Sequence, residues 1–255
     1  MSSSYNDLLG FAMELYAYLL LSNTFAPYGA SETRTLPYDP FITSLSSVIS
    51  PYATFGTMFA GGHALFELIP QISVLQSQRL TEEAQGSGGP SMQLRNSHDT
   101  LAHAIDRWTF PDQPSDPDPR DRKKAAEALR HGLRIYLATA FCGSVVSDPK
   151  VICAMQDEVD MIISIIQDLS DLQYLATLLW PILIAASCMV KDDQRAEVAA
   201  ALSQSHYQMS HLSMAVNLLE KLWKDKDQRA YGPYGLYFIM ENCAAVVQLN
   251  EALDE

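Results

Sequence analysis

The feature that most constrains the fold is a pair of helix starts, Asp118-Pro119 and Asp148-Pro149. An Asp side chain caps free backbone N–H groups at a helix start, and Pro fits the first helical position because its missing N–H would have no partner there. Gly143 is expected to close the first of the two helices. After the second start, one apolar stripe runs for about five turns. It consists of Ile152, Met155, Val159, Ile162, Ile163, Ile166 and Leu169.

The remainder of the chain shows the same helical period, with no competing strand pattern. Further helices are predicted near residues 4–22, 41–49, 52–59, 62–79, 98–108, 172–190, 192–204, 207–224 and 233–250. Two stretches rich in Pro, Gly, Asp and Ser are predicted to be flexible loops, at 81–97 and 111–119. Because apolar stripes occur on both sides of these loops, we predict an all-α fold, a single multi-helix globular domain over residues 1–255.

Composition limits the classes of protein to which the chain can belong. With 48% hydrophobic and 18% charged residues, it is expected to be globular. The net charge of −13 argues against binding to phosphate backbones, which requires clustered Lys and Arg. The four cysteines have no CxxC or Cys/His zinc spacing, and the first residues lack the basic start of a signal peptide. A reduced, intracellular protein without a zinc site is therefore expected.

One segment is apolar enough to be considered as a membrane span. Leu172–Val190 carries no charge across 19 residues. It contains Gln173, Thr177 and Pro181, however, and no other segment of similar length and apolarity accompanies it. We therefore predict a central core helix here, and no membrane partner.

Short polar patterns raise the question of catalysis. Asn6 to Glu14 resembles the magnesium-binding motif of class I terpene cyclases, which needs an Asp-rich partner on a second helix. The best partner, Asp157–Asp160, fits poorly and follows the motif instead of preceding it, so a chance match is favoured. His63 and Glu67 have i,i+4 spacing, which is more often a helix-surface hydrogen bond than a metal site. We predict no catalytic residue, no metal and no cofactor.

A cluster near the C-terminus is the best candidate for a binding site. Gly235 stands inside a predicted helix, where glycine costs ~1 kcal/mol relative to alanine and so usually permits close approach of a neighbouring helix or a ligand. Tyr237, Phe238 and Met240 follow it, and such side chains describe the wall of an apolar small-molecule pocket. Helix packing and a ligand contact both explain this glycine.

Several blocks of the sequence point to a known family. They are Leu179–Ala186, which contains Trp180-Pro181, then Asp193–Arg195, Ala215–Trp223, Gly62–Ile72 and Ala128–Arg130. With them the chain resembles, from about Leu36 to Leu249, the C-terminal regulatory domain of fungal zinc-cluster transcription factors. This group includes the sterol-responsive regulators of yeasts.

The resemblance implies a nuclear, dimeric protein whose helical domain senses or restrains activation, in some members by binding a hydrophobic small molecule. Such proteins bind DNA through an N-terminal six-cysteine zinc cluster, which this sequence lacks. The chain alone is therefore expected not to bind DNA, as either an excised effector domain or a natural protein that lost its DNA reader. Location in the cytoplasm is expected only if a ligand retains it there or if the DNA reader is naturally absent.

Together these observations favour a helical effector domain of a fungal transcription regulator. It would form a homodimer and respond to an apolar small molecule or a protein partner, with Gly235, Tyr237, Phe238, Met240 and Trp180 as candidate ligand-binding residues. The alternative is a stand-alone enzyme of fungal secondary metabolism, of cyclase or isomerase type, on the same helical scaffold. Its acid–base groups would be His63, Glu67 or Asp160. Scaffolding through dimerisation alone is a third possibility.

Overall fold

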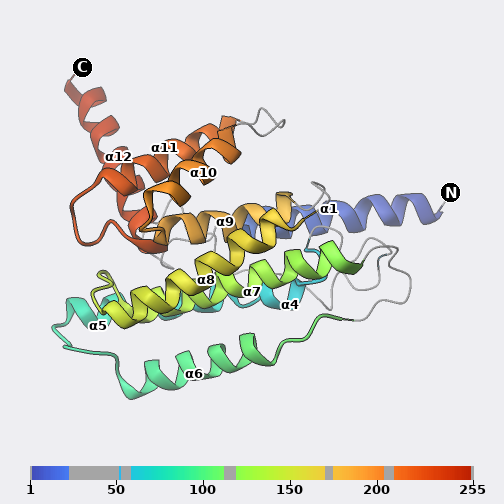
Figure 1. Ribbon diagram of the computed structural model, residues 1–255, viewed down its shortest axis with the longest axis horizontal. Coiled ribbons are helices and arrows are strands. Elements are labelled where there is room, and N and C mark those ends of the chain that lie inside the picture. The colour runs from blue at the N-terminus through green and yellow to red at the C-terminus, as the bar shows by residue number, and fades with distance from the viewer. Residues whose placement is uncertain are drawn as a thin grey trace.

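The computed structural model describes residues 2–22, 52, 59–111, 119–169, 175–203 and 210–253, and every regular element in these ranges is a helix (Figure 1). The prediction of a single all-α domain is confirmed. The helices are α1 (Ser2–Ser22), α4 (His63–Phe66), α5 (Ile69–Ala84), α6 (Met92–Arg107), α7 (Pro119–Cys142), α8 (Pro149–Gln167), α9 (Leu175–Cys188), α10 (Asp192–Ser203), α11 (Ser210–Lys224) and α12 (Gly232–Leu253).

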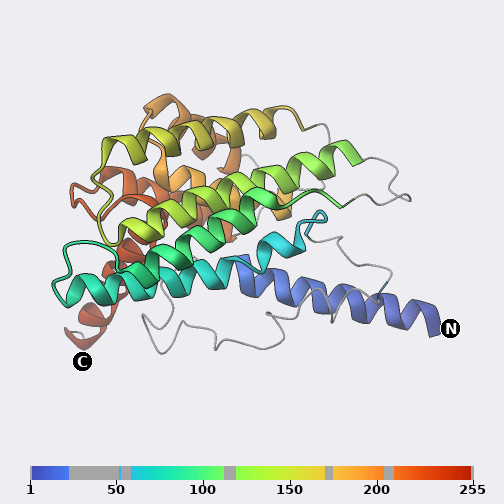
Figure 2. The ribbon, with the colours of Figure 1, turned by 90° about the horizontal axis from the view of Figure 1, so that it is seen from below.

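Helix α7 is the centre of the domain, since α4, α5, α6, α8, α9 and α12 all pack against it. Figure 2 shows α7 running diagonally through the molecule, with α5 and α6 on one side and α8 on the other. Its buried apolar side chains include Leu129, Leu133 and Ala140. A helix surrounded in this way needs apolar residues over more than one face. The core of the domain therefore forms around α7.

The predicted ends of α7 and α8 are confirmed. Helix α7 stops at Cys142 because Gly143 has a φ of 98°, in the left-handed region that glycine adopts at little cost. Helix α8 begins at Pro149, and the Asp148 side chain accepts a hydrogen bond of 2.9 Å from the backbone N–H of Lys150. The Asp-Pro pair thus caps the helix as the sequence indicates.

The loop predicted at 81–97 is shorter than expected. Helix α5 continues to Ala84 and α6 begins at Met92, which leaves only residues 85–91 between them. The extra turn of α6 forms because Ser91 caps it, accepting a 3.2 Å hydrogen bond from the N–H of Leu94, whose side chain is buried. The prediction gave too much weight to the Gly and Pro residues and overlooked this cap. Residues 112–118 of the second predicted loop, and nearly all of the helices predicted at 41–49 and 52–59, lie outside the described residues.

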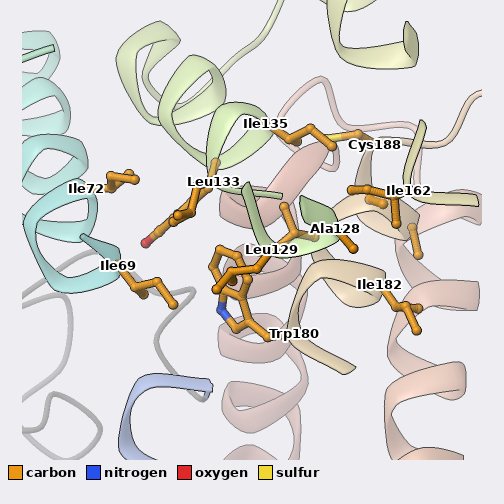
Figure 3. Packing of buried hydrophobic residues seen from close by; sticks show 14 of the residues in the cluster. Ile69, Ile72, Ala128, Leu129, Leu133, Ile135, Ile162, Trp180, Ile182 and Cys188 are labelled. Atoms are coloured by element: carbon orange, nitrogen blue, oxygen red, sulfur yellow. The ribbon is translucent and has the colours of Figure 1, made fainter. Parts of the chain in front are cut away.

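The apolar segment tested as a membrane span forms α9, a helix of the core. Trp180 is 1% exposed, and Pro181 lies inside the helix. Figure 3 shows the Trp180 side chain beside Leu129 of α7, and Ile69 and Ile72 of α5 pointing into the same core. In the part of the chain that the structure describes, no helix is both long and apolar enough to cross a bilayer.

Candidate functional site

The candidate cluster of the sequence lies at the start of α12, directly after the turn that follows α11. Gly235 is buried, and a Cβ atom placed there would lie 2.8 Å from Cδ1 of Leu222. It would also lie 2.9 Å from the carbonyl carbon of Ala230 and 2.9 Å from the carbonyl oxygen of Arg229. Only glycine lets α12 approach its own preceding turn and α11 this closely. Of the two explanations offered for this glycine, helix packing has direct support.

The three neighbours of Gly235 on α12 are partly buried. The guanidinium carbon of Arg229 lies 4.3 Å from the centre of the Phe238 ring, which is cation–π geometry. Tyr237 lies near Tyr234, with ring centres 6.0 Å apart, and Met240 is also partly buried. At the start of α12, aromatic and thioether side chains therefore lie at the edge of the core, partly exposed to solvent. Their role in ligand binding stays a prediction.

Trp180 takes a different position from the α12 cluster. It meets Tyr136 of α7 edge to face, with ring centres 5.8 Å apart, and contacts the position of Gly132. Tyr136 is completely buried, and this burial raises the pKa of its hydroxyl. Trp180 is thus a packing residue between α7 and α9.

Hydrogen bonds between polar groups connect α8, α9 and the loop that precedes α12. The side-chain amide of Gln156 donates to the carbonyl of Cys188 at 2.7 Å and to the hydroxyl of Tyr231 at 3.4 Å. Burial raises the pKa of the Cys188 thiol to about 12, while hydrogen bonds with Ser187 and Tyr231 lower it. A buried, protonated thiol is a poor nucleophile. This network holds α12 against α8 and α9, and it offers no activated group for catalysis.

The acid–base candidates are separated from that network. Burial lowers the pKa of His63, Glu67 raises it, and Arg122 lowers it, so the imidazole is neutral near pH 7. Asp160 lies on the surface of α8, where it accepts hydrogen bonds from Lys191 at 3.1 Å and from Gln194 at 2.6 Å. Burial alone would raise the pKa of Asp160, but these hydrogen bonds and the charge of Lys191 together lower it below its usual value.

The magnesium pattern is not assembled in the part of the chain that can be described. Glu14 is fully buried in α1, whereas Asp160 is bound by Lys191 on the surface. Among the described residues, no three His, Cys, Asp or Glu side chains come together as metal ligands. The enzyme alternative gains no support from these positions and stays a prediction.

Sequence reasoning missed a polar set on the buried face of α5. Ser73 is 2% exposed, Gln76 is 0% exposed and Arg79 is 7% exposed. They follow Ile69 and Ile72 on the same face and are three residues apart, so the apolar stripe of α5 turns polar along its length. A buried charge on a core-facing stripe is costly without a partner. The spacing of these three residues is visible in the sequence. Polar residues with this spacing are equally typical of a helix face exposed to solvent, so the sequence does not show that they are buried.

Comparison with known proteins decides the family. Residues 2–242 match the family described as fungal specific transcription factor domain, which is almost the whole chain. The chain belongs to this family. This confirms the resemblance seen in the sequence blocks. No curated protein and no solved structure matches the chain.

Membership of the fungal transcription factor domain family gives the protein a role in transcription regulation. The start of α12 is also influenced electrostatically by α5. Glu83, one turn beyond Arg79 on α5, contributes to raising the pKa of Tyr234, after the larger effect of burial and against Arg229, which lowers it.

Proposed function

We propose that this fungal transcription factor domain is a ligand-responsive regulator in the nucleus, which binds an apolar small molecule at the start of α12. One observation carries the proposal: Tyr237, Phe238 and Met240 form a partly buried, largely apolar surface on a helix that packs on α7, α9 and α11. A ligand seated there would contact the element that ties these helices together. Binding would therefore change the relative populations of their arrangements.

The proposal includes a homodimer as the working unit. Its support is the exposed apolar surface of α1, where Leu8 is 66%, Leu9 40%, Phe11 38% and Tyr16 52% exposed. Large apolar side chains that gather on one helix are typical of a protein interface. A second copy of the chain would bury them.

The test measures whether the chain changes transcription in response to a ligand. The chain is fused to an unrelated DNA-binding domain, and a reporter gene is measured in yeast while lipid extracts of the source cells are added. We expect reporter output to change with the extract. We expect Phe238→Ala to abolish that change, because the substitution removes the ring at the centre of the proposed surface.

The matched control is Met214→Ala, which truncates an apolar side chain on neighbouring α11 that is 69% exposed. This variant should respond as the wild type does. Circular dichroism of both variants checks that the fold is retained. The proposed function would be contradicted if no extract changed reporter output, or if the Phe238→Ala variant responded as the wild type does.

A further inference from the structure

The buried polar set of α5 contains hydrogen-bonding atoms that the described residues do not satisfy. Both polar atoms of the Gln76 side chain are buried, and no described residue bonds to them. The same holds for Nε and Nη1 of Arg79. Buried polar atoms almost always have a partner, and a buried positive charge needs a negative one. The two side chains are one turn apart, so one group can meet both.

The carboxylates nearest to Arg79 along α5 accept hydrogen bonds from backbone N–H groups outside α5. Glu82 accepts a 3.0 Å hydrogen bond from the backbone N–H of Ser91, before α6. Glu83 accepts a 2.9 Å hydrogen bond from the N–H of Ser144, after α7. Each therefore holds a neighbouring helix end.

The nearby thiol of Cys142 supplies no negative charge either. Its pKa is raised by burial and by Asp148, and Arg79 lowers it only in part. The thiol is therefore neutral at physiological pH. Arg79 is close enough to Glu82 to lower the pKa of that carboxyl, but no described residue accepts a hydrogen bond from its Nε or Nη1.

We propose that Gln76 and Arg79 bind the carboxylate of an organic acid with an apolar body. A carboxylate accepts charge-assisted hydrogen bonds from a guanidinium, and the Gln76 amide can donate one more. One guanidinium balances one negative charge, which fits a monocarboxylate better than a phosphate dianion. The body of the ligand would be apolar because Ile72 and Leu75, the neighbours on this face of α5, are buried apolar residues.

This inference rests on the proposed function, because it names the chemistry of the ligand. The ligand would extend from α5 toward the start of α12, because both elements meet the last turns of α7. A Cβ atom placed at Gly143 would lie 2.8 Å from Oε2 of Glu83, and one placed at Gly232 would lie 3.2 Å from Cγ2 of Thr139. Its acid group would sit at Arg79, and its apolar body would continue toward Tyr237 and Phe238. The site would thus join two elements that are far apart in sequence.

The experiment compares decanoate with 1-decanol, which share an apolar body and differ in charge. Titration calorimetry measures their affinities for the full chain and for Arg79→Met, Gln76→Leu and Arg107→Met. We expect the wild type to bind decanoate at least about tenfold more tightly than decanol, the scale of a charge-assisted hydrogen bond. Arg79→Met should remove this preference without weakening decanol binding, and Gln76→Leu should reduce it. Arg107→Met, which changes an exposed arginine of α6, should keep it.

The outcomes separate this inference from the proposed function. Equal affinities for decanoate and decanol, or a preference that survives Arg79→Met, would overturn the carboxylate site and leave apolar ligand binding intact. Binding of neither probe would contradict both. Competition by inorganic phosphate at millimolar concentration would show a general anion site and overturn the assignment to a carboxylate.

Thermal unfolding gives a second, independent result. Without ligand, Arg79→Met should raise Tm, because it removes buried N–H donors that have no acceptor and keeps an apolar stem. A lower Tm would show that Arg79 is paired within the chain, which would overturn the inference. Decanoate should raise the Tm of the wild type and not that of Arg79→Met.

Discussion

The close approach at Gly235 gives the sharpest prediction about how α12 is held. In Gly235→Ala, the new methyl group would lie 2.9 Å from two backbone atoms, of Ala230 and Arg229, and 2.8 Å from the Leu222 side chain. Leu222 can rotate, but the backbone atoms must move. Overpacking costs roughly 1–3 kcal/mol, and a clash with backbone atoms belongs to the upper part of that range, roughly 2–3 kcal/mol, of which the better helix propensity of alanine returns ~1 kcal/mol. We therefore expect a net loss of about 1–2 kcal/mol, or a fall in Tm of about 2–8 °C.

The matched control is Gly88→Ala, because nothing lies within 4 Å of a Cβ atom placed at Gly88 and its φ is not in the left-handed region. This variant should stay within about 0.5 kcal/mol of the wild type. Urea unfolding followed by circular dichroism measures both. If Gly235→Ala proved as stable as Gly88→Ala, the glycine would not be explained by helix packing.

Three further changes test other parts of the fold. Ser91→Ala should lower the free energy of unfolding by ~1 kcal/mol, since α6 loses its cap; an unchanged urea midpoint would refute this. Trp223→Phe should cost ~1 kcal/mol in the same assay, because the indole N–H no longer donates its 2.9 Å hydrogen bond to Ala186, and a smaller change would mean that water replaces it. Burial lowers the pKa of His63 below 6.5, so the unfolded chain binds the proton more readily and stability should fall as the pH drops through 6.5. His63→Gln should flatten this dependence between pH 8 and 5, and an unchanged slope would contradict the assignment to His63.

Much of the fold could be predicted because helix ends have local chemical signals. Asp148 and Pro149 start α8, and Gly143 ends α7, as their side chains and backbone preferences require. The start of α6 was predicted six residues too late. Ser91 lies directly after a Gly- and Pro-rich stretch, and the loop was therefore predicted to continue past it. A single serine cap with a buried Leu94 decides the boundary there, and such a signal is weak until the packing is known.

The candidate site could be predicted only in part. The aromatic cluster of α12 was visible because apolar side chains beside a helical glycine are unusual. Trp180 was recognisable as a large apolar residue, but its packing between α7 and α9 depends on long-range contacts. Gln76 and Arg79 could not be found, because the sequence does not show which face of α5 meets α7.

Native mass spectrometry of the purified chain, followed by denaturing extraction, tests most directly the claim that this domain responds to an apolar molecule. The account predicts a bound small molecule that extracts into organic solvent, or a mass shift when candidate metabolites are added, and its loss in Phe238→Ala. A chain that stays free of ligand under all these conditions would contradict the account and would favour a domain that acts only through protein contacts.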